Sequence, residues 1–495
     1  MKKLLVVVLG VIALQAQVVS AADQLVVHEW GTFTSLHDEQ GRSLRSINTD
    51  DEPVPGFVHQ LWPFATRLVS PIDLSVEPGP YRSQGGLEAD PRVTMRLETP
   101  VLYFHLPPSE SQLTLDLNVE FRRGFLTEFF PKAISSISGP TSANQINSRI
   151  VPRAGSLRWN GVQVGSPGSF PETSEHVWLA PRKVRSAPVI VGNESEQYLF
   201  YRGIGDLESP LQVVRQPDQT LNVRINQRAL KLLEQDLRES AIRNVSNIQH
   251  ELTDRTTWEA IVTKQSLWLL DVRPNGQSAF RSLATHSNPG TDADNLITAS
   301  AKFSDEQYSS QNLVKLRSEM REALIADGLF ADEADAMLNT WELSYFVSPG
   351  QRLFYILPRS WTDAVLPLSL SVPAEIIRVM VGRIELVTPR QRQLIDQIAA
   401  ASVPEMKDVV SQMRKLQSDP IRRADYNALA SGRGDSSLLQ VPVPPSYQAF
   451  LDLGRFRRSL ILDAINQDPG AKMRELDLLR QFQFELLYPG KLKRE

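Results

Sequence analysis

The spacing of apolar and polar residues predicts that most of the chain between residues 23 and 225 forms β-strands. Across residues 113–121 an apolar side chain stands at every second position, the period of a strand with one buried face. Residues 25–36 are rich in Val, Thr and Phe, and a turn signal follows them at residues 38–41. Many short strands with turns between them favour a β-sandwich-like body. Further strands are predicted at residues 93–105, where Pro100 indicates an edge or a bulge, and at 157–164, 177–179, 189–191, 198–201 and 211–214.

Helical spacing interrupts this pattern in the second half of the chain. Leu230, Leu233 and Leu237 follow the period of a helix, which is predicted over residues 226–247. Two more helices are predicted at residues 310–327 and 332–341. Strands return at residues 267–272, 278–283, 352–357, 364–372 and 376–387, and the last is apolar on both faces, as a buried central strand is.

The pattern changes again at Thr388. The segment Thr388-Pro389-Arg390-Gln391 combines a helix N-cap, proline at the first helical position and a capping-box glutamine. Ser402 and Ser418 begin similar signals, so residues 388–495 are predicted to be almost wholly helical. We therefore expect an α+β fold, divided into a signal peptide (1–22), a β-rich domain (23–225), a helical connector (226–265), a second β-rich segment with a helical insertion (266–387) and a helical C-terminal region (388–495).

The first twenty-two residues have the pattern of a secretory signal peptide. Lys2 and Lys3 precede an apolar run over residues 4–19, and Ser20-Ala21-Ala22 supplies the small residues that a signal peptidase recognises. The run is short for a membrane span and polar near its end. Cleavage before Asp23 and a periplasmic or secreted mature protein are therefore expected.

Composition narrows the classes of partner and of chemistry. The formal net charge is −4, and it becomes about −6 when Lys2 and Lys3 leave with the signal peptide. A nucleic-acid-binding protein would carry a basic face, so this acidity argues against such a partner. The chain has no cysteine, which excludes disulfides, a thiol nucleophile and a lipid anchor on cysteine.

The densest group of chemically versatile residues follows the signal peptide. On a strand, His28 and Glu29 point to opposite faces, so a metal site would combine one of them with groups that the fold brings in. Candidate metal ligands are His28, Asp50, Asp51 and His59. Imidazole with carboxylates suits zinc or another divalent transition metal, whereas the acidic run alone suits calcium. The alternative is a capped turn with solvated acids and hydrogen-bonded histidines.

Two carboxylates are candidates for general acid or base chemistry, Glu29 and Glu98. Arg96 and Glu98 share one strand face, and a neighbouring charge of this kind can set the pKa of a catalytic carboxyl. The same spacing also forms structural ion pairs. Candidate substrate-binding residues are Trp30, Arg359 and Trp361, although Trp361 equally suits a place in the core.

Several segments resemble a group of exported bacterial proteins that share the motif HEWGTFT, which here is residues 28–34. The similarity also includes TDDEPVPGFVH, RLETPVLYFH, LNTWELSYF and LPRSWTDAVLPL, and it covers most of residues 25–390. The resemblance implies a bacterial source and export. It implies no activity, cofactor or catalytic residue.

Two functions from different classes are consistent with these observations. The first is an extracytoplasmic hydrolase whose site uses carboxylates or a divalent metal. The second is a non-catalytic protein that binds a glycan, such as an envelope or extracellular polysaccharide, or acts as a scaffold. In the second case the helical C-terminal region would bind a protein partner.

Overall fold

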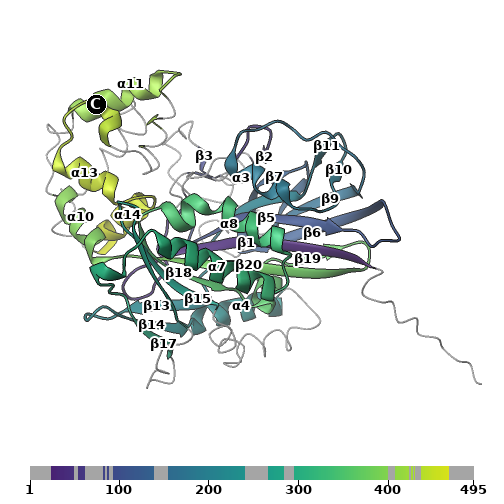
Figure 1. Ribbon diagram of the computed structural model, residues 1–495, viewed down its shortest axis with the longest axis horizontal. Helices are drawn as coiled ribbons and strands as arrows, with labels where there is room; N and C mark the ends of the chain where they lie inside the picture. The colour runs from purple at the N-terminus through teal and green to yellow at the C-terminus, as the bar shows by residue number, and fades with distance from the viewer. Residues whose placement is uncertain are drawn as a thin grey trace, which may run out of the picture.

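The computed structural model describes residues 24–48, 54–61, 82–83, 86–87, 93–138, 154–239, 266–283, 295–399, 407–422, 425–426, 429 and 436–467. Within these residues, hydrogen bonds join fifteen strands into one mixed sheet. A smaller sheet has the order β13-β14-β17, and β3 pairs with β4. The protein is therefore a mixed α/β structure built around one large sheet (Figure 1).

The large sheet contains β1 (Leu25–His37), β2 (His59–Gln60), β5 (Met95–His105), β6 (Leu113–Arg122), β7 (Gly124–Phe130), β8 (Ile134–Ser138), β9 (Ala154–Val164), β10 (Val189–Val191), β11 (Glu194–Glu196), β12 (Leu199–Gly205), β15 (Leu267–Val272), β16 (Ser278–Ser282), β18 (Gly350–Ile356), β19 (Leu368–Leu370) and β20 (Ala374–Leu386). The other strands are β3 (Arg82–Ser83), β4 (Gly86–Leu87), β13 (Leu211–Arg215), β14 (Thr220–Ile225) and β17 (Asn295–Ser300).

The α-helices are α3 (His176–Leu179), α4 (Gln227–Glu239), α7 (Gln311–Ala326), α8 (Ala331–Thr340), α9 (Arg359–Val365), α10 (Pro389–Ala399), α11 (Lys407–Ser418), α13 (Pro445–Asp452) and α14 (Arg457–Gln467). A π-helix, Glu342–Val347, follows α8, and short 3₁₀ helices lie at Pro181–Lys183, Asp305–Gln307 and Ser436–Leu439. None of the described helices is long and apolar enough to cross a membrane.

Strand β1 lies near the middle of the large sheet. It pairs in parallel with β20 over its whole length and antiparallel with β5. The two β-rich segments that the sequence separates thus contribute neighbouring strands to one sheet. Strand β20 has neighbours on both edges and layers on both faces, so most of its side chains are apolar. Its buried charged residues, Arg378, Arg383 and Glu385, lie in ion pairs.

The bulge predicted at Pro100 is present. The pairing of β1 with β5 shifts between Trp30 and Thr32, and Thr99 adopts a positive φ of 43° beside it. A Cβ atom on Gly31 would lie only 3.0 Å from Cα of Pro100, so a larger residue here would push Pro100 away from β1.

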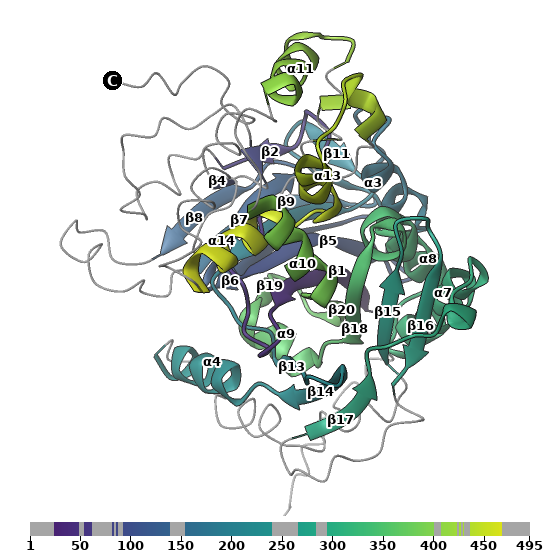
Figure 2. The ribbon, with the colours of Figure 1, turned by 90° about the vertical axis from the view of Figure 1, so that its left-hand side faces the viewer.

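Both faces of β1 are covered. On one face, Trp30 belongs to an apolar cluster that residues of α7 and α8 complete, and Figure 2 shows these helices beside β15 and β16. On the other face, the Phe33 ring contacts the Phe121 ring of β6 at 6.2 Å and the Trp361 ring at 4.9 Å. The side chains of β1, apart from half-buried Val26, are therefore shielded from bulk water. A ligand could reach a site on β1 only if a covering side chain or helix moved.

The predicted β-sandwich is not confirmed as two separate sheets. Fifteen of the described strands form one hydrogen-bonded sheet. This sheet folds back on itself, because Phe121 on β6 contacts Phe33 on β1 although these strands do not pair. Periodicity identifies the strands, but it does not say which strands share a sheet.

The described elements after Thr388 are helices that pack around their own apolar cluster. That cluster includes Leu36 of β1 and Val387, and the helices gather at one end of the molecule (Figure 1). The capping box is formed, since the Gln391 amide N–H donates to Oγ1 of Thr388 and the Thr388 N–H donates to Oε1 of Gln391. The signal at Ser402 and the last predicted helix lie outside the described residues, so a wholly helical C-terminal region stays a prediction.

Two predicted strands are wrong in part or in whole. Residues 177–179 belong to helix α3, because Trp178 is buried against Phe200 at 4.7 Å and donates from Nε1 to Glu196. Residues 364–372 divide between α9 and the short β19, since α9 begins after Pro358 and ends just before Pro367. In both segments, tertiary contacts and proline outweigh the preference of Val and Leu for strands.

Candidate functional site

Three side chains that can bind a metal meet between the start of β1, the end of β5 and the first turn of α8. They are His28 on β1, His105 on β5 and Glu333 on α8, and one ligand atom from each lies within 4.8 Å of the other two. Nδ1 of His28 donates to Oε2 of Glu333 at 2.6 Å, and Nε2 of His105 donates to Oε1 at 2.9 Å. We call this group the His-Glu cluster.

The strands and the helix each place one part of the His-Glu cluster for a local reason. His28 lies opposite Tyr103, so His105, two residues further along β5, falls on the same face of the sheet. Glu333 lies in the first turn of α8, where the Phe330 N–H donates to its Oε2 at 2.8 Å. A carboxylate suits this position, because helix N-termini carry unpaired N–H groups and a partial positive charge.

Burial and hydrogen bonding together set the charge of the His-Glu cluster. Burial opposes ionisation of Glu333, but hydrogen bonds from His105 and His28 outweigh it and lower the pKa of Glu333. Burial, together with the negative charges of Glu333 and Asp332, raises the pKa of nearby Tyr103 well above its usual value. At neutral pH the Glu333 carboxylate is therefore ionised, and the neighbouring Tyr103 hydroxyl keeps its proton.

Phe330 covers the His-Glu cluster on the solvent side. Its ring centroid lies 4.6 Å from that of His28 and 4.8 Å from that of His105. His28 and Glu333 are fully buried, whereas the Phe330 residue is 47% exposed. Movement of this one side chain would change access to both imidazoles.

The His-Glu cluster fits a divalent transition metal. Two imidazoles and one carboxylate form a ligand set found in catalytic zinc sites, which keep a fourth position open for water or substrate. Nδ1 is the ring nitrogen of His28 that faces Glu333, whereas Nε2, on the other side of the ring, is buried and has no hydrogen-bond partner among the described residues. Bonds of 2.0–2.2 Å to a tetrahedral metal place ligand atoms about 3.3 Å apart. The present nitrogen–oxygen separations of 2.6 and 2.9 Å are those of hydrogen bonds, so these ligand atoms would move apart when an ion binds between them.

The other candidate metal ligands do not join His28 among the described residues. His59 lies on β2, and its Nε2 donates to the Glu194 carboxylate at 2.8 and 3.0 Å. Asp50 and Asp51 lie outside the described residues. Of the four candidates, the structure therefore places only His28 in the His-Glu cluster.

The two candidate acid–base residues lie in separate buried ion pairs. Glu29 points to the face of β1 opposite His28, where it accepts hydrogen bonds from Tyr201 and from Nε of Arg378 at 2.5 Å. Burial opposes the charge of Arg378, but Glu29 outweighs it and raises the pKa of the guanidinium. Both carboxylate oxygens of Glu29 are thus engaged by the protein itself.

Glu98 faces three guanidinium groups. Nη2 of Arg383 donates to its two oxygens at 3.1 and 2.9 Å, and Nη2 of Arg96 lies 3.1 Å from Oε1. Arg455, from the C-terminal helical region, adds a longer contact at 3.6 Å. This arrangement links the C-terminal helices to the central sheet, and it is separate from the His-Glu cluster.

The candidate substrate-binding residues are spread over the fold. Trp30 is fully buried beside Tyr103, and Trp361 is buried against Phe33. Arg359 is exposed, donates to Asp363 and also reaches the backbone carbonyl of Ile376. As placed, both tryptophans fill the core, and Arg359 lies on the surface.

His105 and Glu333 are absent from the candidates derived from the sequence. His105 ends a predicted strand, and only the pairing of β5 with β1 brings it beside His28. Glu333 has the local signature of a helix-capping carboxylate and is 305 residues from His28. No local spacing rule joins these positions.

Comparison with models of known protein families and with curated proteins finds no match for this chain.

Proposed function

We propose that this protein is an exported, metal-dependent hydrolase. One observation carries the proposal: His28, His105 and Glu333 converge with their ligand atoms within 4.8 Å, on elements distant in sequence. The ligand set suits zinc better than calcium, because calcium prefers six or more oxygen ligands.

A bound zinc ion would supply a Lewis acid and lower the pKa of a bound water. The protein's own groups would hold the ion and restrict access to it. Hydrogen bonds keep Glu333 ionised, the sheet fixes both imidazoles, and Phe330 limits the access of water. The partly exposed edge of His105 is the side from which a substrate would approach.

The location outside the cytoplasm is part of the proposal. It is supported by the basic start, the apolar run over residues 4–19 and the small residues at 20–22. N-terminal sequencing of exported protein tests it, with Asp23 expected first. Membrane-bound protein that retains Met1 would contradict it.

A second candidate function is non-catalytic binding of an envelope or extracellular polysaccharide. A pocket lined by several arginines, which shares no residue with the His-Glu cluster, favours this function for a polysaccharide that carries acidic groups. Here the C-terminal helical region would bind a protein partner, and the strand-rich body would bind the glycan.

Metal-dependent hydrolysis distinguishes the two functions. The mature protein would be stripped with chelator, reloaded with zinc and assayed on chromogenic esters, phosphoesters, glycosides and peptides. We expect hydrolysis of one class that chelator abolishes, zinc restores and Glu333→Gln removes. The matched control is Glu194→Gln, which alters the separate pair between His59 and Glu194. Zinc-loaded protein without activity on any class, or equal loss in both variants, would contradict the hydrolase proposal.

A further inference from the structure

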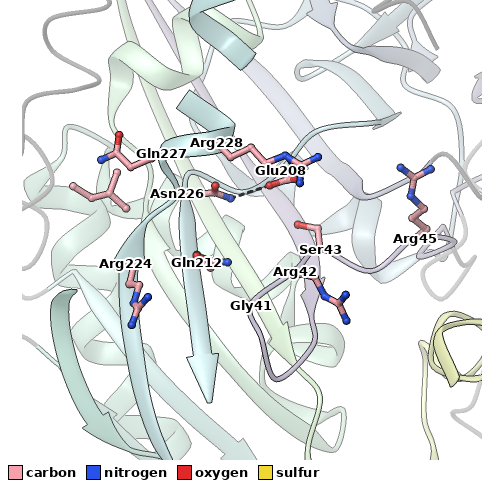
Figure 3. A pocket seen from close by; sticks show the side chains of 11 residues that line it. Gly41, Arg42, Ser43, Arg45, Glu208, Gln212, Arg224, Asn226, Gln227 and Arg228 are labelled. Atoms are coloured by element: carbon pink, nitrogen blue, oxygen red, sulfur yellow. Dashed lines mark hydrogen bonds and ion pairs between the residues drawn. The ribbon is translucent and has the colours of Figure 1, made fainter. Parts of the chain in front are cut away.

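A pocket of about 430 Å³ lies beneath the turn that follows β1. Its walls come from that turn, from the connection between β12 and β13, from β13 and β14, and from the first turn of α4 (Figure 3). The pocket shares no residue with the His-Glu cluster. Its charged lining residues are Arg42, Arg45, Arg224, Arg228 and Glu208, and the polar Asn226 also lines it.

Positive charge dominates this pocket. Four arginines line it against one carboxylate, that of Glu208. Asp38 neutralises part of this charge, since its Oδ2 lies 2.7 Å from Nε of Arg42. Glu208 lies 3.6 Å from Nε of Arg228. Among the lining residues, arginines outnumber carboxylates, and guanidinium groups stay protonated at any physiological pH.

The start of α4 adds a second feature that favours an anion. The Asn226 side chain caps the helix by accepting from the Ala229 N–H at 3.1 Å, and it donates to Glu208 at 3.2 Å, as Figure 3 shows. This fixes the first turn of a 13-residue helix at the pocket wall. The partial positive charge of the helix N-terminus therefore acts in the same direction as the arginines.

The turn after β1 is held rigidly against β13. Gly41 has a φ of +74°, and a Cβ atom there would lie 2.5 Å from the Gln212 side chain, so only glycine allows this approach. The Asp38 carboxylate accepts from the backbone N–H groups of Gln40 and Arg42. The cations of the turn are thus carried on a preformed scaffold, which reduces the entropy lost when a ligand binds.

We propose that this pocket binds a small polyanion through its phosphate or carboxylate groups. Planar guanidinium groups pair with both kinds of oxyanion through two parallel hydrogen bonds. The described lining contains no aromatic side chain on which a neutral sugar would stack. The volume falls within the usual range for small-molecule sites, about 300–1,000 Å³.

Calorimetric titration of the mature protein with pyrophosphate and with citrate tests this proposal. We expect binding of at least one probe at low salt, weakened as ionic strength rises, and no binding of neutral maltose. Arg224→Gln and Arg228→Gln should each weaken binding about tenfold, the effect of losing one hydrogen bond between charged groups. Preference for pyrophosphate would identify phosphate as the recognised group, and preference for citrate would identify carboxylate.

Two controls keep the test specific. Arg158→Gln removes another arginine with an exposed side chain, on β9 and away from the pocket, and it should leave binding unchanged. Both probes also chelate metals, so each titration is repeated with Glu333→Gln, where the same affinity is expected. Absence of binding by both anions, or equal weakening by Arg158→Gln, would overturn the proposal. Loss of binding only in Glu333→Gln would do so as well, because the anion would then be recognised at the His-Glu cluster.

Discussion

Nδ1 of His28 and Oε2 of Glu333 lie 2.6 Å apart although 305 residues separate them in the chain. This contact fastens the first turn of α8 to the central strand of the sheet. The π-helix that follows α8 makes a second attachment, in which the Tyr345 hydroxyl bonds Thr32 of the same strand face. The covering segment is therefore fixed at two points, and Phe330, which immediately precedes α8, is held over the imidazoles.

Shortening Phe330 should open the His-Glu cluster without unfolding the protein. In Phe330→Ala we expect the unfolding free energy to change by about 1 kcal/mol or less, because the ring is half exposed. Diethyl pyrocarbonate should then modify His105 several times faster, as measured by mass spectrometry of the digested protein. Val314→Ala, another exposed apolar truncation on α7, is the control and should leave this rate unchanged. An unchanged rate in Phe330→Ala would show that Phe330 does not limit access.

Replacing Glu29 alone should lower the unfolding free energy of the protein. In Glu29→Ala the buried Arg378 guanidinium loses its main partner, and removing one member of a buried ion pair typically costs about 3–5 kcal/mol. Replacing both residues, in Glu29→Leu with Arg378→Met, should recover much of this loss because no unpaired charge remains. Denaturant unfolding measures both effects. If Glu29→Ala unfolds like wild type, the ion pair is not structural and the catalytic hypothesis for Glu29 gains support.

Acid should destabilise the protein through His37. Burial lowers the pKa of His37 to about 3, so the folded state excludes a proton that the unfolded chain binds below about 6.5. Stability from this group is therefore complete above pH 6.5 and declines as the pH falls toward 3. Between pH 7 and 5, wild type should lose about 2 kcal/mol more unfolding free energy than His37→Gln.

The control for this comparison is His176→Gln, at an exposed histidine, and its curve is measured beside the other two. Parallel curves for wild type and His37→Gln would contradict the assignment of this effect to His37.

Removing the C-terminal helical region should change both helix content and stability. A chain ending at Val387 loses α10, α11, α13 and α14, and with them the ion pair between Arg392 and Glu39 at 2.8 Å. It also exposes Leu36 and Val387, which those helices bury. We expect a large fall in the helical circular-dichroism signal and a lower melting temperature. A nearly unchanged spectrum would contradict the prediction that residues 388–495 are mostly helical.

Features encoded over a few residues could be predicted from the sequence. The period of residues 113–121 gives β6, the prolines at 100 and 389 mark a bulge and a helix start, and the Thr388 capping box forms as its spacing predicts. Strand order could not be predicted in this way. The parallel pairing of β1 with β20 joins residues about 350 apart, and periodicity gives a strand no information about its partner.

Only part of the candidate site could be predicted from the sequence, for the same reason. His28 could be selected because it lies in the densest group of chemically versatile residues in the sequence, and the structure places it in the His-Glu cluster. Its partners come from a strand pairing and from a helix that covers the sheet, so they depend on tertiary contacts. The strand predicted at residues 177–179 is wrong for a related reason, since the burial of Trp178 against Phe200 favours the helix found there.

Zinc stoichiometry tests most directly whether the His-Glu cluster binds a metal ion. The mature protein would be stripped with chelator, titrated with zinc by calorimetry and analysed for bound metal after desalting. We expect one zinc ion per chain, and a higher melting temperature when zinc is bound, because the ion binds only the folded state. His28→Ala, His105→Ala and Glu333→Gln should each lose this ion, whereas His59→Ala should keep it. A wild-type protein that binds no zinc, or that binds it equally in His105→Ala, would contradict the account.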